Sequence, residues 1–345
     1  MPGADLAPYW AVWGKAMIKE SYLNAVVIAL FILIPVCAYF ANEPFIITSM
    51  TRAAILALAA LGLHIALGLG GLVSLGHAVF FGLGGYVMGI LAYHAQSYVP
   101  LVEWPFVFEG TKSMPIIWLI TLFISSLAAL LIGVLSLRTS GVYFIMITLA
   151  FGQMFFFFAI SWPAYGGEDG LPIYIRNHFP GLNTLDPIQY FALCFVILCI
   201  TLFFVERLTK SPFGLVLNAA RQVPERIEAV GMSPQHIKLV AFVLSGAITG
   251  LAGALYADLN RFVSPSMFSW QLSGELMVFL IIGGVGRLFG PVIGALVFVG
   301  LEHLVGGLSD FWHIYLGLLL LLIVLFGKGG LIGILSGQKK VTHGS

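Results

Sequence analysis

Residues 53–70 read AAILALAALGLHIALGLG, an apolar run in which His64 is the one ionisable side chain. Such a run is close to the roughly twenty apolar residues that a helix needs to cross the hydrocarbon core of a bilayer. The whole chain has this character, because 60% of its 345 residues are hydrophobic and 9% are charged. A soluble domain carries about 25% charged residues. The sequence therefore predicts an all-α, multi-pass membrane protein, with the lipid bilayer as its solvent.

About ten transmembrane helices are expected from segments of this kind. They cover roughly residues 22–41, 53–70, 74–94, 115–135, 142–161, 188–206, 237–257, 272–286, 288–305 and 313–333. The eighth is short and adjoins the glycine-rich sequence GGVGRLFGP of residues 283–291, so the eighth and ninth form either two spans or a re-entrant pair. We expect a single transmembrane domain over residues 22–335.

The distribution of basic residues predicts the orientation of the chain. If residues 1–21 lie inside, the inner segments hold twelve of the sixteen Lys and Arg residues, and the outer segments carry an acidic surplus. This assignment makes the N-terminal segment 1–21, the loop 207–236 and the tail 336–345 cytoplasmic.

Several classes of function lack their sequence signals. A formal net charge of +1 gives no reason to expect nucleic-acid binding. Residues 327–330, GKGG, lack the spacing and the Ser or Thr of a phosphate-binding loop, so any ATP is expected on another chain. Paired carboxylates or metal-spaced histidines near one depth are not apparent, which disfavours a membrane-embedded enzyme. We expect no catalytic residue, cofactor or metal.

The most polar stretch is ERLTKSPFGLVLNAARQVPERIEAVGMSPQHIKL, residues 206–239, which lies between two apolar segments. Ser211-Pro212, Pro224 and Ser233-Pro234 predict three helix starts, and Gly231 is suited to end the middle piece. That piece is too short to be stable alone in water. Its apolar residues Ile227, Val230 and Met232 are expected to fill a groove of a soluble partner. The alternative is an amphipathic helix on the lipid surface.

A polar path through the membrane is expected near residues 68–89, which contain eight glycines together with Ser74 and His77. Glycines permit close helix packing, and they also permit unwinding that exposes backbone polar groups to a small polar solute. His64 is either part of this path or a neutral histidine bonded to a neighbouring helix. The predicted path residues are His64, Ser74, His77, Gly84, Gly85, Thr148 and Gln153.

The outer loop SWPAYGGEDGLP, residues 161–172, is rich in turn-forming residues. It is either a simple connector or a rigid acidic turn that receives a soluble solute-delivering partner. The residues expected in such docking are Gly166, Gly167, Glu168, Asp169 and Gly170.

Several segments resemble those of the permeases of branched-chain amino-acid ABC importers, the second permease of the pair most closely. They are SLGHAVFFGLGGY (74–86), GVYFIMITLAFGQM (141–154), GGEDGL (166–171), residues 211–257, residues 262–295 and LLLLLIVLFGKGGLIGIL (318–335). The resemblance implies a sister permease, two ATP-binding cassette subunits in the cytoplasm and an extracytoplasmic solute-binding protein.

The resemblance also implies a location in the cell (inner) membrane. It further implies that residues 225–234 form the helix that couples the permease to an ATPase. The coupling residues are then Glu225, Arg226, Ile227, Glu228, Ala229, Gly231 and Met232. The loop departs from the general importer pattern, because residues 228–231 read EAVG where many families have EAA and a more distant glycine. Related permeases carry urea or short amides, so that substrate class stays open. A stand-alone secondary carrier or channel is a further alternative, although the scarcity of buried carboxylates disfavours proton coupling.

Overall fold

The computed structural model describes residues 9–97, 100, 109–306, 314–315, 317–318, 321, 330–331 and 333. Residues 1–8 of the expected N-terminal segment, the expected tail 336–345 and most of the expected tenth span, 313–333, lie outside the described residues. Within them the fold is all-α, as predicted, apart from one short antiparallel pair of strands, β1 (Leu171–Pro172) and β2 (Phe262–Val263).

Prolines set the starts of many of the helices, because a proline at the first helical position loses no hydrogen bond. The long helices are α1 (Tyr9–Phe40), α2 (Pro44–Leu63), α3 (His77–Ser97), α4 (Met114–Ser136), α5 (Val142–Ile160), α6 (Pro187–Lys210) and α9 (Pro234–Asn260). The shorter elements are η1 (His64–Leu69), η2 (Pro163–Tyr165), α7 (Pro212–Gln222), α8 (Pro224–Ala229), η3 (Pro265–Phe268), α10 (Trp270–Gly283) and α11 (Gly290–Gly306).

Six helices of the described chain are long and apolar enough to cross a membrane. Three shorter apolar stretches, Asn24–Phe40, Trp270–Gly283 and Gly290–Leu304, accompany them. The protein is thus a multi-pass membrane protein. The second span begins nine residues before its expected start, because Pro44 opens α2 and the polar residues Thr48, Thr51 and Arg52 lie inside the helix.

The expected eighth and ninth spans form a tight hairpin of α10 and α11. A Cβ added at Gly283 would lie 1.8 Å from the carbonyl oxygen of Gly290, and one at Gly294 would lie 1.9 Å from that of Phe279. The two helices can approach so closely because glycines stand at their contact points. With 14 residues, α10 is shorter than a full span. Its length favours the re-entrant alternative.

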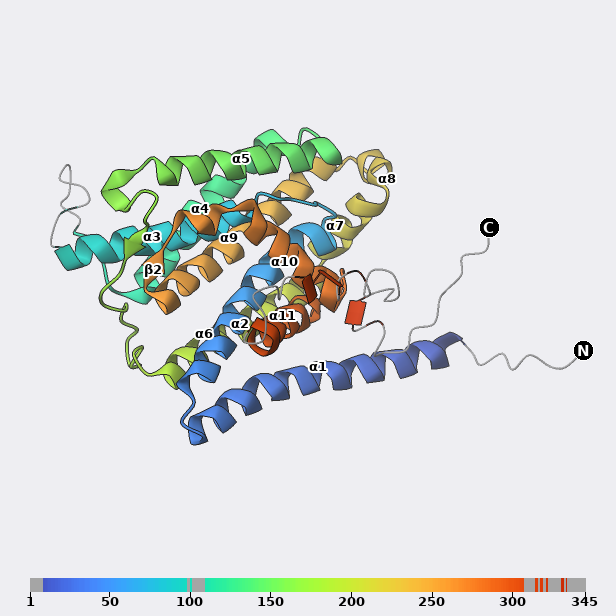
Figure 1. Cartoon of the computed structure of the whole chain (residues 1–345). Coiled ribbons are helices and arrows are strands. Elements are labelled where there is room, and N and C mark those ends of the chain that lie inside the picture. Colours follow the sequence, from blue (N-terminus) through green and yellow to red (C-terminus); the bar gives the residue numbers. More distant parts are fainter. Residues whose placement is uncertain are drawn as a thin grey trace, which may run out of the picture.

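Helix α2 lies at the centre of the bundle, where it contacts α1, α6, α9, α10 and α11. Within its most apolar stretch, continued by η1, 89% of the residues are buried, compared with 22% in α5. Figure 1 shows α1 and α5 at opposite edges of the bundle, with α7 and α8 at one end. The first described residues of α1 lie at that same end, while β2 and the start of α6 lie at the other.

Candidate functional site

The loop between α6 and α9 folds into α7 and α8, and all three predicted helix starts are confirmed, at Pro212, Pro224 and Pro234. The Ser211 hydroxyl accepts a hydrogen bond from the Gly214 amide at 3.2 Å and so caps α7. Helix α8 follows after Val223 and ends where Gly231 takes a left-handed conformation, φ +83°. There the Met232 amide donates to the Ile227 carbonyl at 3.1 Å, which closes the last turn.

The surface of α8 combines mixed charges with an apolar tip. Val230 is 72% exposed and Met232 is 39% exposed. Ile227, by contrast, is only 8% exposed and holds α8 against its own chain. The expectation that Ile227 lies on the exposed apolar side of α8 is therefore wrong. The remaining predicted coupling residues Glu225, Arg226, Glu228, Ala229 and Gly231 are exposed.

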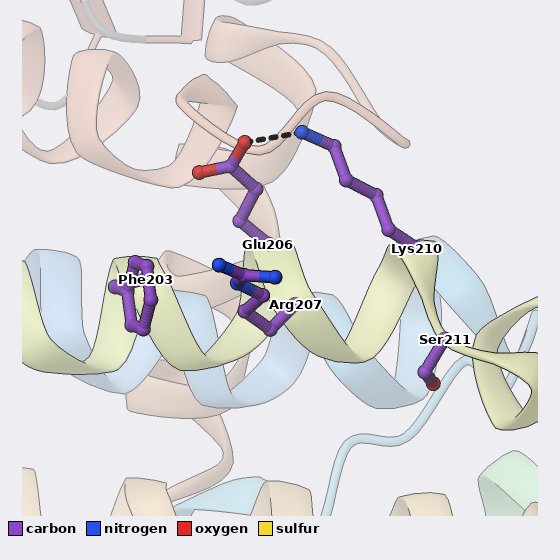
Figure 2. Close-up of a pocket in the computed structure, with 5 residues that line it drawn as sticks. All are labelled: Phe203, Glu206, Arg207, Lys210 and Ser211. Carbon is purple, nitrogen blue, oxygen red and sulfur yellow. Dashed lines mark hydrogen bonds and ion pairs between the residues drawn. The ribbon is translucent and has the colours of Figure 1, made fainter.

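A groove of about 530 Å³ lies beside the end of α6, just before this loop. Figure 2 shows its lining residues, Phe203, Glu206, Arg207, Lys210 and Ser211. Glu206 and Lys210 form an ion pair at 2.5 Å on the exposed side of the helix, and the Arg207 guanidinium lies 5.3 Å from the centre of the Phe203 ring. An exposed ion pair such as Glu206–Lys210 adds little stability. The groove contains none of the predicted coupling residues.

Arg221 connects the loop to the end of α2, a contact that the sequence analysis missed. Its Nη1 atom donates a hydrogen bond to the Gly68 carbonyl inside η1. A Cβ added at Gly71 would lie 2.9 Å from the Arg221 Cγ atom, so the two chains touch here. In the sequence, Arg221 is one of many basic residues in the segments expected to be cytoplasmic, and it carries no distinguishing signal.

Two of the predicted path residues are buried histidines. The His77 Nε2 atom and the Ser245 hydroxyl are 2.8 Å apart, and that hydroxyl donates to the Gly62 carbonyl at 2.6 Å. His77 thereby ties α3 to α9 and α2. His64 is 1% exposed, within η1.

The other path residues also make local contacts in this conformation. Ser74 accepts from the Gly76 amide at 3.2 Å, and Thr148 donates to the Ile145 carbonyl at 3.0 Å. A Cβ at Gly84 would lie 1.8 Å from the Gly250 carbonyl oxygen, and one at Gly85 would lie 2.5 Å from the Met267 Cε atom. Gln153 is half-buried. The described cavities are lined by none of the seven path residues, so their role in a solute path stays a prediction.

The outer loop is rigidly built around its glycines. Gly166 and Gly170 have φ values of +85° and +82°, and β1 follows directly and pairs with β2. The carboxylates of Glu168 and Asp169 are exposed, whereas Gly167 is buried. The turn therefore presents two acidic side chains at the end of the bundle opposite α8.

Within the outer loop, Tyr165 anchors the chain to α3. Its hydroxyl lies 3.0 Å from the Nε2 atom of His94. Burial, and to a smaller degree the neighbouring Tyr93, raises the pKa of the Tyr165 phenol.

A second polar cluster at this end was also missed by the sequence analysis. The Arg176 guanidinium donates to the carbonyls of Thr184 and Leu259 at 2.7 and 2.9 Å, lies 3.9 Å from the Asp258 carboxylate and covers the Tyr190 ring. A cavity of about 170 Å³ adjoins it. Among the described residues no group of three or more His, Cys, Asp or Glu side chains is placed to hold a metal ion.

Known proteins similar to this chain are membrane transport components. The chain is 27% identical over 310 residues to the high-affinity branched-chain amino acid transport system permease protein LivM of Escherichia coli, which covers 83% of this chain and 69% of the relative. The Salmonella typhimurium protein of the same name is 27% identical over 82% of this chain and 69% of its own length. A probable branched-chain amino acid transport permease protein LivM of Methanocaldococcus jannaschii is 30% identical over 40% of this chain and 44% of its own length.

Comparison with the solved structures gives no significant match. The family described as "Branched-chain amino acid transport system / permease component" matches residues 45–326, more than three quarters of the chain. The chain therefore belongs to this family of transport permeases.

Proposed function

We propose that this protein is one permease subunit of an ATP-driven importer for branched-chain amino acids. It forms the solute path with a sister permease, and two ATP-binding cassette subunits bind the end of the bundle that carries α7 and α8. The observation that carries this proposal is α8, a short helix with an apolar tip and mixed charges, held at one end of a family-assigned permease. The charge distribution of the loops supports a cytoplasmic position for this end.

In this proposal ATP binding and hydrolysis occur on the partner chains and move α8. Coupling requires that α8 contact the ATPase differently in the two states of the transporter, because a partner shifts an equilibrium only through its differential interaction with the two states. Val230 and Met232 fill a groove of the ATPase, and Glu225, Arg226 and Glu228 surround that contact. Ile227 acts from within by fixing α8 to the bundle.

Copurification tests the coupling surface. We expect soluble ATPase subunits to copurify with the wild-type chain and to be lost when Arg226→Ala and Glu228→Ala are combined. Glu206→Gln with Lys210→Gln is the matched control, because it also removes an exposed pair of opposite charges at this end but lies outside α8. Unchanged ATPase recovery with the α8 variant would contradict the assignment.

At the other end of the bundle, we propose that a solute-binding protein docks on the acidic turn of residues 166–170. Glu168 and Asp169 are exposed on a backbone fixed by glycines and by the β1–β2 pair, so the carboxylates are held in place before the partner arrives. The double variant Glu168→Gln with Asp169→Asn is expected to bind the solute-binding protein more weakly. It is expected to copurify with the ATPase subunits as the wild-type chain does.

The substrate assignment rests on the relatives, whose names specify branched-chain amino acid transport. Uptake of radiolabelled leucine and of radiolabelled urea by cells that express the complete importer distinguishes the candidate substrates. We expect leucine uptake to require this chain. Leucine uptake that survives deletion of the chain would refute the assignment, and ATP-independent uptake driven by an ion gradient would indicate a secondary carrier.

A further inference from the structure

The end of α2 that faces α7 changes its helical form. From His64 to Leu69 the chain continues as the π-helix η1. Beyond it, the Gly70 amide bonds the Ile65 carbonyl at 3.1 Å and the Leu72 amide bonds the Ala66 carbonyl at 2.9 Å, before regular structure stops. Such π-helical turns interrupt the regular hydrogen-bond ladder and often occur at functional sites.

The side chain of Arg221, in the loop between α6 and α9, contacts this π-helical segment and the residues after it. Arg221, in the last turn of α7, donates its Nη1 hydrogen bond to the Gly68 carbonyl, and the stem of its side chain covers Gly71. Gly71 has a φ of +70°, and a Cβ there would also lie 3.1 Å from the Arg221 Cδ atom. Position 71 thus requires glycine for its backbone conformation and for the arginine that crosses it.

The segment held in this way leads directly to the buried polar residues in the interior. Residues 70–76 connect η1 to α3, which begins at His77. A Cβ at Gly76 would lie 2.5 Å from the Thr148 carbonyl oxygen on α5, so the segment touches the exposed edge helix of the bundle. His77 then joins α9 through Ser245.

Among the described elements, the contact of α7 with η1 differs in kind from the other contacts of α7 and α8. Helix α7 contacts α6, α8, α9 and η1, and α8 contacts α7 and α9. The contacts with α6 and α9 join regular helices. The contact with η1 is a side-chain hydrogen bond from a guanidinium to a carbonyl in an irregular segment, and a displaced carbonyl there changes the path of residues 70–76.

We infer that Arg221 is a positioning residue that transmits displacement of α7 and α8 to η1 and to residues 70–76. The inference rests on the proposed ATP-driven transport and assigns to one side chain the step between the ATPase surface and the interior. A hydrogen bond from an ionised donor is stronger than one between neutral groups, which suits it to keep the two segments together as they move.

The test measures leucine uptake per ATP hydrolysed, in vesicles that contain the complete reconstituted importer and its binding protein. Arg221→Met keeps the apolar stem over Gly71 and removes the donor. We expect uptake per ATP to fall about tenfold, the factor that corresponds to loss of one charge-assisted hydrogen bond of about 1.4 kcal/mol. Arg221→Lys keeps a charge and a donor and is expected to lose less.

Gly71→Ala provides an independent disturbance of the same contact from the other side. Gly181→Ala is its control, because Gly181 also has a positive φ, +83°, but a Cβ there meets nothing within 4 Å. Gly71→Ala is expected to lower uptake per ATP and Gly181→Ala to leave it unchanged.

Unchanged uptake per ATP in both Arg221→Met and Gly71→Ala would overturn the inference, as would a parallel loss of uptake and ATP hydrolysis that leaves their ratio constant. The ratio is measured on assembled complexes, so a variant that merely reduces assembly does not change it. A wild-type importer without ATP-dependent uptake would instead refute the proposed function.

Discussion

The contact between α3 and α9 at Gly84 gives a quantitative test of the helix packing. A Cβ added at Gly84 would lie 1.8 Å from the Gly250 carbonyl oxygen, whereas ordinary contact begins at 3.4 Å. In Gly84→Ala the two helices must therefore separate locally by about 1.6 Å, the difference between those distances. Both atoms involved are fixed by helical backbone, so no side-chain rotation relieves the contact.

The expected cost follows from the behaviour of overpacked cores. Forced insertion of one methyl group destabilises a well-packed core by about 1–3 kcal/mol, and a rigid backbone contact belongs at the upper end of that range. A loss of about 3 kcal/mol in the free energy of unfolding lowers the Tm of a protein of this size by about 5 °C. Thermal unfolding of the purified importer, followed by fluorescence, measures this shift.

Gly274→Ala is the matched control for this measurement. Gly274 lies inside α10, and a Cβ there meets nothing within 4 Å. Without a clash, Ala in place of Gly stabilises a helix by about 0.5–1 kcal/mol. A Gly84→Ala protein that unfolds at the temperature of the Gly274→Ala protein would refute the argument from backbone contact.

Three further predictions concern stability. Arg176→Met leaves the buried Asp258 carboxylate without its cation and is expected to cost about 3–5 kcal/mol, with partial recovery when Asp258→Leu is added, as measured by Tm. Gly231→Ala places a Cβ at φ +83° and is expected to cost about 1–2 kcal/mol locally, seen as faster amide hydrogen exchange in residues 227–232 with little change in Tm. Burial raises the pKa of Tyr165 above its value in the unfolded chain. The contribution of this phenol to the free energy of unfolding is therefore complete below about pH 10 and is lost at higher pH. Tyr165→Phe is expected to reduce the loss of stability at alkaline pH, as measured by a pH series of Tm values.

The features that depend on local sequence were predictable. Apolar runs located the helices, because a membrane-spanning helix can be recognised from the length and composition of one segment. The Ser-Pro pairs and Gly231 divided the loop after α6 correctly, because caps and left-handed residues act within a few positions. The family resemblance rested on such local segments, and the match over residues 45–326 confirms it.

The features that depend on contacts between distant segments were not predictable from one sequence. Ile227 looked like part of an exposed apolar face, and only its packing against the chain shows that it is buried. Arg221 and Arg176 resembled ordinary interfacial cations, because their partners Gly68 and Asp258 lie 153 and 82 positions away, respectively. Helical periodicity carries no information about such pairs.

The α10–α11 hairpin has a consequence for how the protein enters the membrane during synthesis. At 1.5 Å per residue, α10 extends about 21 Å, less than the roughly 30 Å of a hydrocarbon core. It is too short to be released into lipid as an independent span. Arg52 on α2 forms an ion pair with Glu302 on α11 at 2.8 Å, and the Ser273 hydroxyl of α10 accepts from the Ala78 amide of α3. We therefore expect α10 to enter the membrane together with α11, after α2 and α3 are in place to supply these partners.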